Sequence, residues 1–244
     1  MKTRKNKYKD KNKNQIQKLI DNTYKLVDKN KKGKVATYIP ELAKANPHIF
    51  GICFITCNGE IYQAGDANVP IPIESISKVF ALAMAVDEFG QNEIDNKIGN
   101  VGSSLPFNSI IATVLSPTHT INPFVNPGAI ATVSLFYNKN KRAFEKKILS
   151  NMDNYAGKKL KFLNNLYKSE ASTNSTNMAI GHLLKSFNKL YGEVDDSVDV
   201  YIKQCSVATS AKDLATMACV FATGGIHPFT NKKIISEDAA NYTY

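Results

Sequence analysis

The chain has 244 residues, of which 43% are hydrophobic, so it can bury the core of one or two domains. Its formal net charge is +10, but residues 1–34 hold 13 of the 31 basic residues and 3 of the 21 acidic residues, which leaves the remainder neutral. The excess charge therefore belongs to an N-terminal segment, and the composition argues against a nucleic-acid-binding face on the globular part.

Residues 1–13 are rich in Lys and Asn and show no apolar periodicity, which predicts a basic disordered tail. Such a tail can contact nucleic acid or an anionic membrane, but it contains a single aromatic residue, Tyr8, and a solvated terminus is the favoured interpretation. The sequence shows neither an apolar segment long enough to cross a membrane nor the apolar centre of a signal peptide. We therefore expect a cytoplasmic protein with neither a membrane nor a nucleic acid as its partner.

The four cysteines fit a reducing compartment. Cys53 and Cys57 lie on one predicted strand about 13 Å apart, which is too far for a disulfide. Cys205 and Cys219 lack the spacing of zinc ligands, and none of the four histidines stands near another potential ligand in the sequence. We expect buried free thiols and no metal site.

In chain order, apolar residues recur at helical spacing over residues 14–29 and predict an amphipathic helix. Two apolar runs, 52–57 and 60–64, then flank Asn58-Gly59, which is the strongest short signal for a hairpin. Two antiparallel strands therefore precede the next helix.

That helix runs from residue 75 to 89 and ends at Gly90. Residues 91–128 are rich in Gly and Pro and predict loops and short helices. Further helices are expected at 129–136, at 144–152, around 180–187 and at 210–223. This order predicts an α+β fold in which an antiparallel sheet is packed by helices beside a helical lobe. One hairpin supplies fewer strands than a stable sheet needs, so the sheet should need more strands than the sequence pattern of this chain indicates.

The candidate catalytic residues lie at the start of the helix that begins at residue 75. A loop stiffened by Pro70 and Pro72 brings Ser75 to the first turn, and Lys78 follows on the same face. A serine hydroxyl is a weak nucleophile until a base removes its proton, and a lysine buried among apolar groups can be neutral enough to do so. The positive end of the helix can stabilise the oxyanion of an attacked carbonyl.

The Ser-x-x-Lys spacing alone is not specific, because a second copy, Ser186 to Lys189, falls in a predicted amphipathic helix. Ser75 has a purely structural alternative as the N-cap of a buried helix. The stiff loop that precedes Ser75 favours the catalytic interpretation.

Four motifs carry a family resemblance. They are Gly-Lys-Val-Ala-Thr-Tyr-Ile-Pro at 33–40, Gly65-Asp66 ahead of the Ser75 motif, Asn-Pro-Phe-Val-Asn-Pro-Gly-Ala at 122–129, and Ser169-Glu170 followed by Asn177. In this order, over residues 33–235, they resemble the serine-dependent glutaminases, which share the fold of serine β-lactamases and penicillin-binding proteins.

The resemblance implies hydrolysis of L-glutamine to L-glutamate and ammonia, through a γ-glutamyl ester on Ser75 with Lys78 as the base. It requires no metal or organic cofactor. The substrate-binding residues that it implies are Tyr38, Ser75, Asn126, Glu170, Asn177 and Tyr201.

The residue types suit a free amino acid, because its ammonium needs a carboxylate such as Glu170 and its carboxylate needs amide donors such as Asn126 or Asn177. A continuous helix over 170–177 would set Glu170 and Asn177 on one face.

The chain departs from the family pattern at its end. Family members continue for several tens of residues beyond the position of Tyr244, and that part supplies the remaining strands and a second oxyanion donor. We therefore expect residues 14–244 to form an incomplete domain with weak or no activity alone, and a homo-oligomer or a complementing C-terminal fragment as partner. The alternatives are a catalytically inactive subunit for binding or oligomerisation, one half of a split enzyme, and a penicillin-type acyltransferase or β-lactamase, which the lack of an export signal disfavours.

Two substitutions near the motifs also depart from the pattern. Glu74 replaces the usual Gln, and its carboxylate, four residues before Lys78, is expected to hold that lysine protonated. Pro127 replaces the usual Ala beside Asn126 and is expected to stiffen the binding loop.

Overall fold

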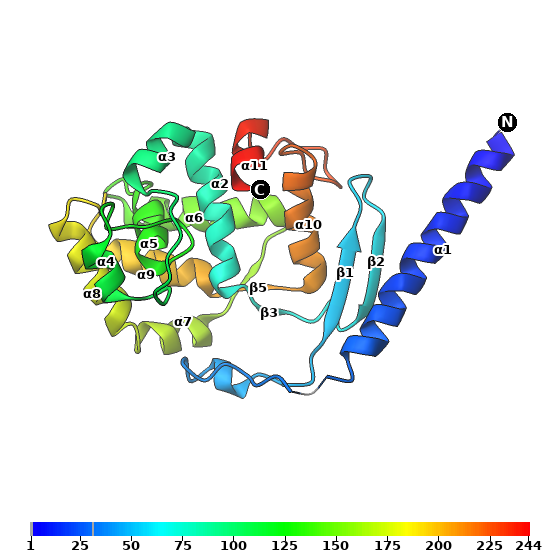
Figure 1. Cartoon of the computed structure of the whole chain (residues 1–244), viewed down its shortest axis with the longest axis horizontal. Coiled ribbons are helices and arrows are strands. Elements are labelled where there is room, and N and C mark those ends of the chain that lie inside the picture. The colour runs from blue at the N-terminus through cyan, green and yellow to red at the C-terminus, as the bar shows by residue number, and fades with distance from the viewer. Residues whose placement is uncertain (1, 31) are drawn as a thin grey trace.

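The computed structural model describes residues 2–30 and 32–244, with the side chains of residues 2–12 left out, and shows an α+β fold (Figure 1). Its helices are α1 (Lys2–Val27), α2 (Ser77–Phe89), α3 (Gln91–Lys97), α4 (Ile110–Leu115), α5 (Asn126–Ser134), α6 (Lys141–Ala156), α7 (Asn164–Ala171), α8 (Ser175–Ser186), α9 (Val194–Cys205), α10 (Ala211–Ala222) and α11 (Glu237–Thr243). The strands are β1 (Gly51–Ile55), β2 (Ile61–Gly65), β3 (Ile71–Pro72), β4 (Lys161–Phe162) and β5 (Val207–Thr209), and the 3-10 turns are η1 (Leu42–Lys44) and η2 (Glu74–Ile76).

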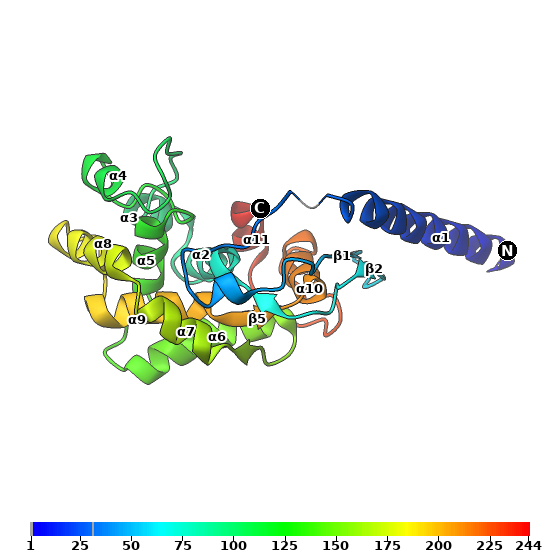
Figure 2. The ribbon, with the colours of Figure 1, turned by 90° about the horizontal axis from the view of Figure 1, so that it is seen from below.

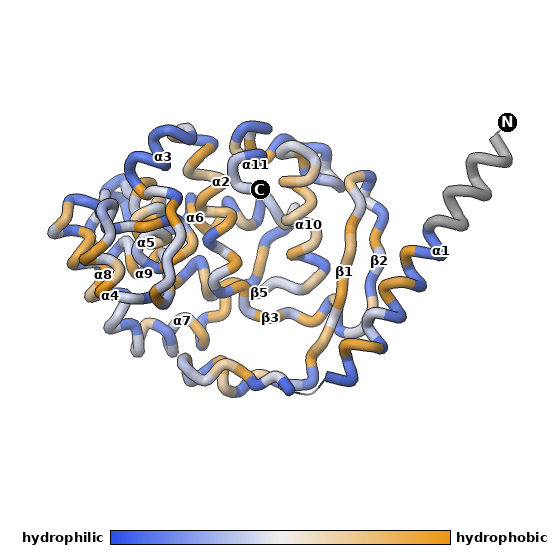
Figure 3. Tube along the Cα trace, in the orientation of Figure 1, coloured by the Kyte–Doolittle hydropathy of each residue, from blue (hydrophilic) through white to orange (hydrophobic). Residues whose placement is uncertain are grey.

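Helix α1 extends from Lys2 to Val27, where the sequence analysis expected a basic tail over residues 1–13 and a helix over 14–29; Met1 lies outside the described residues. Lysine is a good helix former, and a helix nucleated in the amphipathic part can propagate through the basic part. Figure 3 shows hydrophilic and hydrophobic stretches alternating along that amphipathic part. In Figures 1 and 2, α1 projects away from the rest of the chain.

The predicted hairpin is confirmed. Strands β1 and β2 pair antiparallel, with Ile55 opposite Ile61 and Gly51 opposite Gly65. The hairpin lies between α10 and α1 (Figure 1). The ring of Tyr24 in α1 stacks on Phe50, with 5.3 Å between the ring centres. The sheet therefore packs against helices from both distant ends of the described chain.

A second sheet, with strand order β3-β5-β4, was not predicted, because its strands have only two or three residues and give no alternating pattern. Its central strand β5 pairs antiparallel with both neighbours, and Phe162 of β4 lies opposite Val207. The backbone N–H of Ile73 also donates to the carbonyl of Val207, at 2.8 Å. This small sheet fixes the loop that leads to Ser75 against the segment between α9 and α10.

The helical lobe forms the core, and all nine residues of α5 are buried in it. Helices α2, α6, α8 and α9 each pack on α5 or on one another, and the buried aromatic rings of Phe80 and Tyr155 join α2 to α6 at 4.9 Å. The predicted helices at 75–89 and 210–223 are confirmed, the first ending at Gly90 with φ +82° and the second capped by Ser210. The lobe is thus a rigid base for the residues that begin α2 and α5.

The thiols are free, but not all are buried. Cys205 and Cys219 are buried, Cys53 is half-buried, and Cys57 is exposed in the turn after β1. The prediction of buried thiols is therefore wrong for Cys57, because β1 ends at Ile55. No helix within the described part of the chain has the length and apolar character to cross a membrane.

Candidate active site

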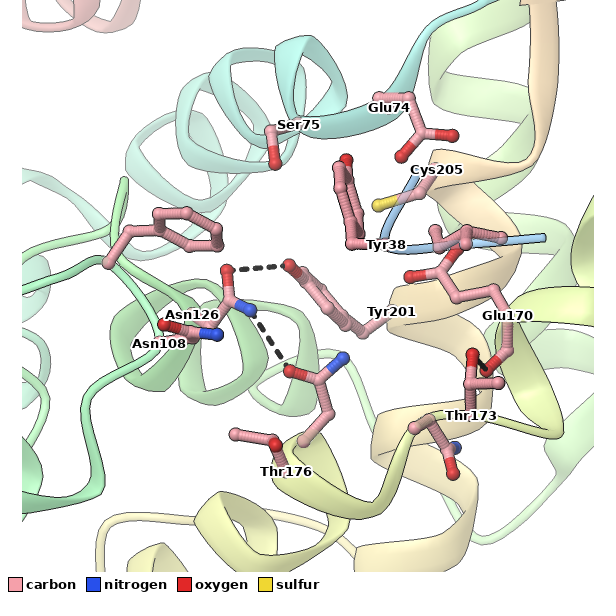
Figure 4. Close-up of a pocket in the computed structure, with 14 residues that line it drawn as sticks. Tyr38, Glu74, Ser75, Asn108, Asn126, Glu170, Thr173, Thr176, Tyr201 and Cys205 are labelled. Carbon is pink, nitrogen blue, oxygen red and sulfur yellow. Dashed lines mark hydrogen bonds between the residues drawn. The ribbon is translucent and has the colours of Figure 1, made fainter. Parts of the chain in front are cut away.

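A cavity of about 260 Å³ opens where η2 meets the starts of α5 and α8 and the ends of α7 and α9 (Figure 4). All six residues that the sequence predicted for substrate binding line it. The full lining is Tyr38, Ile39, Glu74, Ser75, Phe107, Asn108, Asn126, Glu170, Thr173, Asn174, Thr176, Asn177, Tyr201 and Cys205. The structure therefore brings together residues that span more than 160 positions of the sequence.

Ser75 lies in the 3-10 turn η2, directly before α2, and its hydroxyl points into the cavity (Figure 4). Among the described residues its Oγ has no hydrogen-bond partner. The hydroxyl that closes the turn belongs to Ser77, whose Oγ donates to the carbonyl of Glu74 at 2.6 Å. The N-cap position of α2 is Ile76, with no side-chain cap. The structural alternative for Ser75 as an N-cap therefore fails, and its hydroxyl is available to a ligand.

Lys78 is one residue into α2, and its side chain is buried, with 3% of its surface exposed. Its Nζ donates to Oδ1 of Asn126 at 2.8 Å and to the carbonyl of Phe124 at 3.2 Å. Burial lowers the pKa of Lys78, because the charged ammonium loses water, and nearby Cys205 and Glu170 partly oppose this. Burial therefore favours the neutral amine next to Asn126, which lines the cavity.

Asn126 connects the polar groups of the cavity. Its Oδ1 also accepts a hydrogen bond from Oη of Tyr201 at 3.0 Å, and its Nδ2 donates to Oδ1 of Asn177 at 3.0 Å (Figure 4). Pro127 follows in the first turn of α5, where its fixed φ suits the helix start and its missing N–H costs nothing. The expected stiffening of the binding loop by Pro127 stays a prediction, and the hydrogen bonds to Lys78, Tyr201 and Asn177 hold the amide of Asn126.

Glu170 and Asn177 reach the cavity from two different helices. Glu170 lies in the last turn of α7 and Asn177 in the first turn of α8, with a turn at 172–174 between them. A continuous helix over 170–177, which would have set the two side chains on one face, is therefore not formed, because Ser, Thr and Asn side chains in that segment favour a turn over continued helix. The Thr173 hydroxyl, for example, donates to the carbonyls of Ser169 and Glu170.

Two carboxylates line the cavity, and burial is the largest influence on the pKa of each. It raises the pKa of Glu170 to about 8, with a further rise from Glu74 and a reduction from Lys78, and it raises the pKa of Glu74 to about 7. The expectation that Glu74 holds Lys78 protonated is wrong. Glu74 has φ +49° and precedes α2, so its side chain does not follow the helical face of Lys78, and Glu74 is not among the groups that shift the pKa of Lys78.

The sequence did not predict several of the residues that line the cavity. Cys205 lies one helical turn after Tyr201 on α9, so the same face of that helix could have indicated it. Asn108 precedes α4 in a loop, where no spacing links it to the other motifs. Thr176 adjoins Asn177 and would follow once the start of α8 is known. Within the described ranges, no group of three or more His, Cys, Asp or Glu side chains is placed to hold a metal ion.

The sequence pattern that defines the glutaminase family matches residues 33–244. The chain belongs to the glutaminase family. The matched range contains every residue of the cavity and leaves out only the segment that precedes Gly33, so glutaminase membership covers the candidate active site in full.

Similar proteins agree with this family. A glutaminase of Colwellia psychrerythraea is 45% identical over 223 residues, which cover 91% of this chain and 72% of that protein. A glutaminase of Brucella abortus is 41% identical over 204 residues, which cover 84% of this chain and 64% of that protein. This chain thus spans about two thirds to three quarters of the length of these glutaminases.

A solved structure shows the same architecture. The probable glutaminase ybaS superposes with a TM-score of 0.91 at 36% identity, and the match covers 94% of this chain and 74% of that one. The fold is therefore that of the glutaminases, which is the predicted β-lactamase-like arrangement of an antiparallel sheet with a helical lobe.

Proposed function

We propose that this chain is a glutaminase that hydrolyses L-glutamine to L-glutamate and ammonia, with Ser75 as nucleophile and Lys78 as base. The observation that carries the proposal is a lysine with 3% exposure and a lowered pKa beside a cavity into which the Ser75 hydroxyl points unpaired. Relatives named glutaminase at 41% and 45% identity support the choice of glutamine as substrate.

The cavity offers a complementary group for each end of the amino acid. Glu170 supplies a carboxylate for the α-ammonium, while the amides of Asn126 and Asn177 supply donors for the α-carboxylate. Tyr38 and Tyr201 add hydroxyls and ring surface on the wall that carries Glu170 (Figure 4). Bound in this way, glutamine extends its side-chain amide across the cavity toward Ser75.

The chemistry then proceeds in two halves. Ser75 Oγ attacks the amide carbon while Lys78 takes the hydroxyl proton, and the tetrahedral oxyanion lies at the positive end of α2. The carbon–nitrogen bond breaks, the proton passes to the leaving nitrogen, and ammonia departs from a γ-glutamyl ester. Water, deprotonated by Lys78, attacks the ester and releases glutamate, which restores the Ser75 hydroxyl.

The wider organisation is also a proposal. We place one catalytic domain over residues 14–244 and a basic segment before it; the family match over residues 33–244 lies within this domain. We place the protein in the cytoplasm, because its four cysteines are free thiols. Self-association as a homo-oligomer stays a prediction, which light scattering on the purified chain tests.

The test of the function uses a glutamine analogue with an electrophilic diazoketone in place of the γ-amide. We expect one adduct on Ser75 by mass spectrometry, ammonia release from glutamine, and the loss of both in Ser75→Ala. Ser186→Ala is the matched control, because Ser186 begins the second Ser-x-x-Lys copy and lies exposed at the end of α8. If the folded chain forms no adduct and releases no ammonia, the proposal is refuted.

A further inference from the structure

Two acidic side chains share one wall of the cavity. Glu74 comes from η2 and Glu170 from α7, and their carboxylates lie on either side of Cys205 (Figure 4). Oε1 of Glu74 and Oε2 of Glu170 are both buried and without a hydrogen-bond partner. Glu170 is 9% exposed and lines the cavity, so its nine-tenths buried carboxylate lies beside the space that a substrate would fill. Unpaired buried acceptors of this kind require either a proton or a cationic ligand.

The backbone holds Glu74 in this position. Its φ of +49° lies in the left-handed region, which few residues other than glycine adopt and which costs about 1–2 kcal/mol. The β3–β5 pairing before it and the Ser77 hydrogen bond to its carbonyl after it fix the turn on both sides. The strained turn therefore directs the carboxylate toward Glu170 rather than along α2.

The groups around the pair do not neutralise two negative charges. Tyr38, Tyr201 and Cys205 face the carboxylates, and burial raises the pKa of each of the three, so they stay uncharged at neutral pH. Lys78 lowers the pKa of Glu170 but has its own ammonium disfavoured by burial. Glu74 raises the pKa of Glu170, so ionising Glu170 beside an ionised Glu74 is costly unless a cation is present.

We propose that Glu74 and Glu170 act as one proton-holding pair, which gives up a proton to solvent when the α-ammonium of the substrate pairs with Glu170 at the cavity wall. The proposal rests on the proposed function, because it names glutamine as the cationic ligand. The exchange balances: a carboxylic acid loses its proton to water, and the resulting carboxylate pairs with an ammonium that keeps all three of its hydrogens.

Proton exchange makes glutamine binding depend on pH. Below the range in which the pair ionises, each pH unit weakens binding about tenfold, because one proton must leave for each glutamine that binds. Binding strengthens as the pH rises through about 7 and about 8, the pKa values of Glu74 and Glu170. An amino acid amide with an acylated amine cannot replace the proton and should be rejected.

The experiment measures protons directly. The Ser75→Ala protein binds glutamine without turnover, and calorimetry in two buffers of different ionisation enthalpy counts the protons released. We expect about one proton released per glutamine near pH 6, and a smaller number as the pH rises through about 7 and about 8. In Glu74→Gln on the same background, the midpoint of this release should move to lower pH, since Glu74 raises the pKa of Glu170. Glu93→Gln is the control, because Glu93 pairs with exposed Lys97 outside the cavity.

The outcomes separate this inference from the proposed function. Glutamine that binds with no proton release, or with the same midpoint in Glu74→Gln, overturns the proton-holding pair and leaves the glutaminase proposal standing. Glutamine that does not bind at any pH refutes both. If Glu74→Gln does not fold, the proton count of the Ser75→Ala protein alone still decides, because an absent release contradicts the exchange.

Discussion

Lys78 Nζ lies 2.8 Å from Oδ1 of Asn126, so the buried amine faces an amide oxygen and not a carboxylate. An amide accepts a hydrogen bond from either the ammonium or the neutral amine and carries no charge to hold the proton. The pairing therefore orients the amine while leaving its lowered pKa in place. A carboxylate at this position would raise the pKa of Lys78 and hold it as an ammonium, which cannot accept a proton.

Replacing Lys78 by Met tests the base itself. Methionine fills the buried space without an amine, so the fold should persist while the Ser75 hydroxyl loses its proton acceptor. We expect kcat for glutamine to fall by about 10²–10⁴-fold and the melting temperature to hold or rise, since a buried charge is removed. A variant that keeps its full kcat would exclude Lys78 as the base.

Asn126→Asp places a carboxylate against the lysine. The new charge should raise the pKa of Lys78 and keep the ammonium protonated at neutral pH. The acid limb of the rate profile should then move to higher pH, and activity should recover partly in alkaline buffer. Asn108→Asp serves as control, because Asn108 lines the same cavity but makes no hydrogen bond to Lys78. Equal pH profiles in the two variants would contradict the role of the amide.

Tyr167→Phe tests how α7 holds Glu170 in place. The Tyr167 hydroxyl donates to Asp199 of α9 at 2.5 Å, and Asp199 also pairs with Lys141 and Lys203. Without this bond, the end of α7 that carries Glu170 should shift. We expect KM for glutamine to rise several-fold with a smaller change in kcat. Tyr191→Phe is the control, because its hydroxyl makes only a 3.4 Å bond to the Lys97 carbonyl.

The sequence predicted the parts of this fold that are encoded locally. The Asn58-Gly59 hairpin, the helix that ends at Gly90 and the Ser210 cap each depend on residues within one turn of the feature, and all three are present. Motif order also placed the six cavity residues, although no local signal joins Tyr38 to Tyr201. Family likeness supplied that long-range information.

What the sequence could not supply depends on contacts between distant segments. Strands β3, β4 and β5 are too short for a pattern and form only because Ile71 and Phe162 meet the segment after α9. The direction of Glu74 follows from its positive φ, which no residue preference predicts for glutamate. The sequence alone therefore did not predict that Glu74 and Glu170 share one wall of the cavity.

The acidic pair also predicts a pH dependence of stability. The pKa values of Glu74 and Glu170 are raised in the folded chain to about 7 and about 8, against 4.5 without burial, so the folded state binds more protons than the unfolded state above pH 4.5. The contribution of the pair to the free energy of unfolding is thus fully present in acid and is lost as the pH rises through these values. Glu74→Gln should melt higher than wild type near pH 9 and at the same temperature near pH 4. If the difference in melting temperature between Glu74→Gln and wild type does not change with pH, the raised pKa of Glu74 is not its cause.

Gly128, in the first turn of α5, has no room for a side chain, because the backbone of the loop before α5 passes close to it. A Cβ on Gly128 would lie 1.8 Å from the carbonyl oxygen of Asn122 and 2.5 Å from its carbonyl carbon, which are backbone atoms that cannot rotate away. Gly128→Ala should therefore displace the start of α5, which carries Asn126, and destabilise the fold by at least about 1–3 kcal/mol. Gly102→Ala is the matched control, because nothing lies within 4 Å of its added Cβ. Thermal melting compares the two, and glutamine turnover should fall in Gly128→Ala alone. Equal melting temperatures would show that α5 can shift without cost.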